Sequence, residues 1–119
     1  MATKPQPLHI RCSATGTKLI APPMTDAEAC ARFIRAVGTA SATPIAAQVS
    51  GTIGDGLSVE LRFLPQGVAM ASVTRVRAGR PQPPMRYELA VSDRGFRAVD
   101  IDRLARDVAA GMLAAPPRR

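Results

Sequence analysis

An alternating apolar segment followed by a glycine turn constrains the fold of this chain most strongly. Apolar residues occupy every second position from Leu57 to Phe63, a pattern that places them on one face of a β-strand. Pro65-Gln66-Gly67 then forms a three-residue turn in which the glycine can adopt the left-handed conformation. A second apolar segment begins at Val68. The sequence therefore predicts an antiparallel hairpin.

The same alternation predicts the register of this hairpin. If Leu64 pairs with Val68, each large apolar residue of the first strand meets a smaller one on the second strand. The predicted core-facing pairs are Phe63 with Ala69, Leu61 with Ala71, and Val59 with Val73. A shift by one residue would turn all of these side chains to the opposite face, so we expect a single register.

Two amphipathic helices are expected to accompany the hairpin. Thr25 and Glu28 have the spacing of a capping box before the first helix, and Gly38 is its candidate C′ residue. We expect Asp100 to cap the second helix, with Asp102 near its positive end, and we expect Arg32 of the first helix to point away from the apolar stripe. The apolar stripes are Cys30, Phe33, Ile34 and Val37 in the first helix, and Ile101, Leu104, Ala105, Val108 and Met112 in the second.

The remaining segments complete an α+β pattern. A further strand is expected over 86–92, a short strand over 45–49, and a stiff exposed loop without structure of its own over 78–84. The fold class that this order predicts is α+β, an antiparallel sheet of three to five strands with two amphipathic helices packed on one face. The 119 residues suit one domain, which we place at 8–113, with flexible ends at 1–7 and 114–119.

The net charge of +7 invites a search for an anionic partner. However, 14 of the 16 basic residues are arginine, a bias typical of proteins encoded in GC-rich bacterial genomes. One cluster is a candidate binding site, a basic arm at the end of the second hairpin strand and in the following loop: Arg75, Arg77, Arg80 and Arg86. These residues could bind phosphates, an acidic protein surface or lipid head groups, or could serve as solubilising charges at a sheet edge.

Catalytic chemistry finds little support in the sequence. One His and two Cys are too few for a usual zinc site unless carboxylates act as ligands. His9 lies in a proline-rich tail, and Asp100 and Asp102 are two positions apart at a helix start, where they point in different directions. The glycines of 51–56 lead into a strand, whereas nucleotide-binding loops lead into a helix. We therefore expect no enzyme, metal or cofactor.

The two cysteines bear on the cellular compartment. A bridge between Cys12 and Cys30 would staple the N-terminal strand to the first helix and indicate an oxidising compartment. The alternative is two reduced, buried thiols in a cytoplasmic protein. No signal peptide is visible near Met1, so an exported protein would have lost a leader. No stretch is long and apolar enough to form a membrane-spanning helix.

The segment Val59–Val68, preceded by an amphipathic helix, resembles the helix–strand–turn–strand pattern of TonB/TolA-type C-terminal domains. This resemblance covers about a third of the chain and implies a small periplasmic α+β module that binds other envelope proteins, often at a sheet edge. We therefore expect a protein partner, contacted through an exposed sheet face, an edge or the basic arm, and homo-oligomerisation through an edge strand is possible. The alternative function is a cytosolic nucleic-acid or anion binder that uses the same arm.

Overall fold

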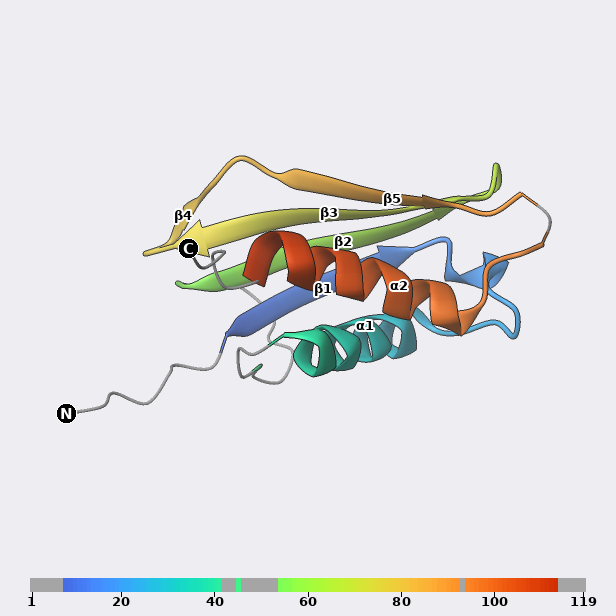
Figure 1. Ribbon diagram of the computed structural model, residues 1–119, viewed down its shortest axis with the longest axis horizontal. Coiled ribbons are helices and arrows are strands. Elements are labelled where there is room, and N and C mark those ends of the chain that lie inside the picture. Colours follow the sequence, from blue (N-terminus) through green and yellow to red (C-terminus); the bar gives the residue numbers. More distant parts are fainter. Residues whose placement is uncertain (1–7, 42–44, 46–53, 93, 114–119) are drawn as a thin grey trace, which may run out of the picture.

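A five-stranded sheet carries two helices on one face (Figure 1). The computed structural model describes residues 8–41, 45, 54–92 and 94–113. The strands are β1 (His9–Thr15), β2 (Gly56–Leu64), β3 (Val68–Arg77), β4 (Arg80–Pro81) and β5 (Met85–Ala90). Their spatial order is β1-β2-β3-β4, and β5 pairs with β3 on the same side as β4. The predicted α+β class is confirmed.

The hairpin of β2 and β3 has the predicted register. Leu64 lies opposite Val68, and the three core-facing pairs are those that the alternation predicts. Their side chains are buried, with both Leu61 and Ala71 fully inaccessible to solvent. Gly67 takes a φ of 88°, the left-handed conformation that the turn requires.

The prediction of a purely antiparallel sheet is wrong for β1, because β1 runs parallel to β2 with His9 opposite Gly56. The reason is the helix between them. A strand followed by a helix that packs on the sheet returns in the same direction, which makes the next strand a parallel neighbour. The sheet is therefore mixed, with β1 at one edge and β5 at the other.

The helices are α1 (Asp26–Ala40) and α2 (Ala98–Val108), and α2 ends in a π-helical turn, Ala109–Leu113. The predicted capping box of α1 is present, since Thr25 Oγ1 accepts from the Glu28 N–H at 3.0 Å and Glu28 accepts from the Thr25 N–H at 2.8 Å. Gly38 is not a C′ residue, because α1 continues to Ala40 and Ser41 caps it.

The start of α2 also differs from the prediction. The helix begins at Ala98, two residues before Asp100, and Arg97 occupies the N-cap position. Asp100 reaches back and accepts from the Arg97 N–H at 2.8 Å. Asp100 is therefore a buried residue of the first turn and not the N-cap. Its carboxylate accepts a hydrogen bond from the backbone N–H of Arg97, the N-cap residue, which has no partner within the helix.

The core lies between the sheet and the helices. It contains the predicted stripes of both helices together with Ile10, Cys12 and Ala14 of β1. Phe96, which the sequence analysis did not assign to the core, is 3% exposed and packs edge-on against Phe63 with 5.3 Å between ring centroids. The segment before α2 is therefore part of the core rather than a simple connection.

Cys12 and Cys30 form a disulfide between β1 and α1. Their Cα atoms are 5.8 Å apart, within the usual range for a bridge, and both side chains are buried. The bridge staples the edge strand to the helix that covers it, as the sequence analysis predicted for the oxidised alternative.

The other expected segments are partly described. The final strand is β5, which ends at Ala90, and the supposedly unstructured 78–84 contains β4. Of 45–49, only Ile45 is described, and it forms a parallel bridge with Leu8. The expected flexible ends, 1–7 and 114–119, lie outside the described residues.

Candidate functional site: the β5 edge

The strand β5 has one side without a partner among the described residues, and it follows the upper margin of the sheet in Figure 1. Val91, just after β5, donates its N–H to the Gly67 carbonyl at 2.8 Å. In an antiparallel ladder, hydrogen-bonded and non-bonded residues alternate. The backbone groups of Tyr87 and Leu89 therefore point toward β3, while those of Arg86, Glu88 and Ala90 point outward.

The side chains of β5 divide between two faces of the sheet. Arg86, Glu88 and Ala90 are exposed on the face away from the helices. On the helix face, Leu89 is buried, Tyr87 is half-buried, and Met85 is 52% exposed. The edge thus offers an apolar side, a charged side, and free backbone donors and acceptors between them.

Tyr87 has a special position at this edge. Its hydroxyl is buried and has no hydrogen-bond partner in the described part of the chain. The hydroxyl lies beside Gly111 in the π-helical turn, where a Cβ would overlap the phenol ring. Burial, followed by the nearby negative charge of Asp107, raises the pKa of Tyr87.

The uncovered face of the sheet is mostly polar. The outward residues of β1 to β3 include Arg11, which donates to Ser58 Oγ at 3.1 Å, and the exposed Glu60 and Arg62 on β2. Interface cores are usually depleted of charged residues and enriched in aromatic ones. This face is therefore a poorer candidate for protein binding than the β5 edge.

The four arginines of the predicted basic arm do not form one cluster. Arg77 and Arg80 lie directly opposite each other on β3 and β4, and both are exposed. Arg75, on the same face as Arg77, is half-buried and donates to the Met112 carbonyl at 3.3 Å. Arg86 pairs with Ser72 and so lies on the opposite face of the sheet. Of the four arginines, the structure therefore places only Arg75, Arg77 and Arg80 on one face of the sheet.

A second basic surface lies between the helices. A groove of about 480 Å³ runs along α1 and α2 and is lined by Arg32, Arg35, Ala36, Thr39, Ala40, Asp102 and Arg106. Arg32 points away from the apolar stripe of α1, as predicted, and donates two hydrogen bonds of 2.8 Å to Asp102, which neutralises its charge. The hydrogen bond that Arg32 donates to the Asp102 carboxylate raises the pKa of Arg32. Arg35 and Arg106 form no ion pair with another described residue.

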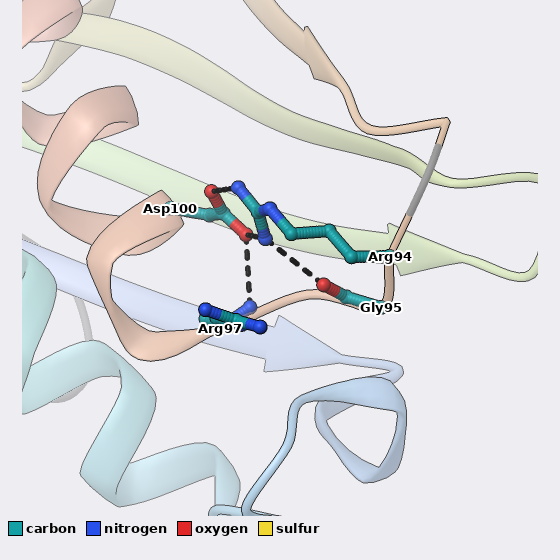
Figure 2. A network of polar contacts seen from close by, with 4 residues as sticks. All are labelled: Arg94, Gly95, Arg97 and Asp100. Carbon is teal, nitrogen blue, oxygen red and sulfur yellow. Dashed lines mark hydrogen bonds and ion pairs between the residues drawn. The ribbon is translucent and has the colours of Figure 1, made fainter.

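The polar network at the start of α2 is structural. Figure 2 shows Arg94 in a two-pronged contact with Asp100, with N···O distances of 2.9 and 2.7 Å. The hydrogen bond from Arg94 lowers the pKa of Asp100, and the Arg97 N–H acts in the same direction. Asp100 is 2% exposed and accepts three hydrogen bonds, two from Arg94 and one from the Arg97 N–H, so it fixes the chain between β5 and α2.

Metal binding and membrane insertion are two further classes of site. In ranges 8–41, 54–92 and 94–113, no three His, Cys, Asp or Glu side chains gather as metal ligands would. None of the described helices has the length and apolar character needed to cross a membrane. His9 is the first residue of β1 and is exposed.

No family model, curated protein or solved structure matches this chain. The resemblance to TonB/TolA-type domains stays a prediction. Sequence reasoning placed Arg86 and Glu88 together on the outward side of the final strand, but it named only Arg86 as a site residue and did not identify this strand as an open edge. The alternation of Arg86 and Glu88 with Tyr87 and Leu89 was a visible signal, but only the topology shows that no strand follows β5 in the described sheet.

Proposed function

We propose that this chain is a non-enzymatic protein-interaction domain that binds an extended segment of a partner protein along β5. The observation that carries this proposal is the row of outward backbone groups at Arg86, Glu88 and Ala90, next to the exposed Met85. A strand added at this edge gains main-chain hydrogen bonds without any special motif. Its side chains would be apolar toward the helices and polar or charged toward the open face.

We further propose that the protein works in an oxidising compartment, such as the periplasm of a bacterium. The disulfide between Cys12 and Cys30 supports this location, because structural disulfides are rare in the reducing cytoplasm. The arginine bias supports a GC-rich bacterial source.

A proline substitution tests binding along β5. Arg86→Pro removes an outward N–H and leaves the β3–β5 hydrogen bonds intact, since proline is tolerated on an edge strand when its nitrogen faces solvent. Peptides selected from a random phage-displayed library against the wild-type protein should alternate apolar and polar residues. Their affinity for Arg86→Pro should fall at least tenfold in fluorescence polarisation.

Arg86→Ala is the matched control, because it removes the same side chain and keeps the backbone donor. It should bind the selected peptides within a few-fold of the wild-type protein. Equal affinity for the proline and alanine variants would place the binding site elsewhere. Circular dichroism on both variants checks that the sheet is retained.

A second candidate function is binding to nucleic acid or another polyanion through the basic arm. The observation in its favour is the direct opposition of Arg77 and Arg80, because like charges facing each other across strands are unfavourable until an anion lies between them. Arg75 lies on the same face, two residues from Arg77.

The double variant Arg77→Ala plus Arg80→Ala tests this second function. If the arm binds phosphate, the variant should weaken binding to random duplex DNA roughly tenfold and reduce the salt dependence of the affinity. The matched control is Arg35→Ala plus Arg106→Ala, which removes equal charge from the interhelical groove. Equal losses in both variants, or no binding by the wild-type protein at low salt, would contradict a specific role for the arm.

A further inference from the structure

The β5 edge is complementary to itself. We propose that two copies of this chain pair through antiparallel β5 strands about a two-fold axis at Tyr87, with Arg86 of each copy opposite Glu88 of the other. This inference rests on the proposed use of β5 as a binding edge, and it names a second copy of the chain as an occupant. A two-fold axis makes such an interface closed, because each copy uses the same strand.

Backbone hydrogen bonding restricts the registers that two β5 strands can adopt. The bond from the Val91 N–H to Gly67 fixes which residues of β5 face β3, so only Arg86, Glu88 and Ala90 present both backbone groups outward. An antiparallel ladder between two copies must therefore oppose members of this outward set. Every such register also keeps the helices of both copies on the same side of the joined sheet.

Charge then selects one of these registers. Pairing Arg86 with its own counterpart brings two guanidinium groups together, and pairing Glu88 with its counterpart brings two carboxylates together. A register with Glu88 opposite Ala90 leaves both arginines unmatched. Only the register centred on Tyr87 places Arg86 of one copy opposite Glu88 of the other. Because the axis is two-fold, this Arg86–Glu88 pair occurs twice in the dimer. Each of the two pairs also exchanges two backbone hydrogen bonds.

The helix face favours the same register. Tyr87 then lies beside its counterpart at the axis, and Met85 lies opposite Leu89 of the other copy. Met85 is 52% exposed in the single chain, and Tyr87 is half-buried, so pairing would remove apolar surface from water on that face. Neither Arg86 nor Glu88 forms an ion pair with another described residue of the same chain, and on β3 they face the uncharged Ser72 and Met70.

Charge reversal tests the pairing by sedimentation equilibrium. The wild-type protein should reach twice its 12.5 kDa chain mass at high micromolar concentration. Arg86→Glu alone and Glu88→Arg alone should each weaken self-association at least tenfold, because two attractive pairs become repulsive. An equimolar mixture of the two single variants should form the dimer again, since every opposed pair then carries opposite charges. The variant with both changes in one chain should also restore it.

The matched control is Arg62→Glu, a charge reversal on the same face of the sheet but in β2, and it should leave self-association unchanged. A wild-type protein that remains a single chain at millimolar concentration would overturn the inference. The inference would also be overturned if neither the mixture of single variants nor the double variant forms the dimer again. Peptide binding that is lost in Arg86→Pro but kept in Arg86→Ala would still support the proposed function, so the two failures are distinguishable.

Discussion

Replacing Cys12 and Cys30 together by alanine is expected to lower the free energy of unfolding by about 3 kcal/mol and the melting temperature by roughly 10 °C. The two cysteines are 18 residues apart in sequence, and opening a loop of this size returns conformational entropy to the unfolded chain. The alanines leave the rest of the β1–α1 contact in place, so the native fold should persist. Urea denaturation followed by circular dichroism measures the loss.

Reducing agent provides the control for this prediction. It should destabilise the wild-type protein by a similar amount and leave the alanine variant unchanged. A variant that unfolds at the same urea concentration as the oxidised wild-type protein would show that the bridge adds nothing to stability. Such a result would also weaken the argument for an oxidising compartment.

The second large effect is expected at Asp100. Asp100→Asn should lower the free energy of unfolding by about 2 kcal/mol, because charge-assisted hydrogen bonds to a buried carboxylate are among the stronger polar contacts. Asp102→Asn is the matched control. Asp102 also makes a two-pronged contact with an arginine, but its side chain is 28% exposed against 3% for Asp100. Asp102→Asn should therefore lower the free energy of unfolding by a smaller amount, at most about 1 kcal/mol.

The contribution of Asp100 should depend on pH in a defined direction. Its pKa is lowered in the folded protein, so the carboxylate contributes fully above the ordinary Asp pKa of about 3.9. The contribution is lost as pH falls below that value and through the folded pKa. The stability difference between the wild-type protein and Asp100→Asn should therefore be constant from pH 5 to 7 and shrink below about pH 4. A difference that grows on acidification would contradict this assignment.

The local features of the fold could be predicted from the sequence because short-range physics determines them. The register of β2 and β3 follows from side-chain sizes around one turn, and the capping box of α1 needs only Thr25 and Glu28. The direction of β1 could not be read in this way. It depends on how α1 packs on the sheet, and the uninformative segment before β2 gave no sign of a crossover.

The start of α2 and its ion pairs show the same limit. Asp100 looked like a cap, because the pattern does not reveal that Arg94 would turn back to meet it from the preceding loop. Arg32 and Asp102 are 70 residues apart, so only the packing of the two helices brings them together. The β5 edge could not be predicted from the local sequence either, because a strand is an edge only if no other strand of the described sheet lies beside it, and that depends on the whole topology.

The parallel partnership of β1 with β2 has a consequence for the order of assembly. Arg11 and Ser58 are neighbours in the sheet although 47 residues separate them in the chain, whereas β2, β3 and β5 follow one another closely. Closing a long loop costs entropy before its contacts form, so we expect the meander of β2, β3 and β5 to assemble first and β1 to dock late. The two cysteines are only 18 residues apart, so the shorter loop between them can close before β1 docks, and the bridge then joins β1 to α1 ahead of the completed sheet.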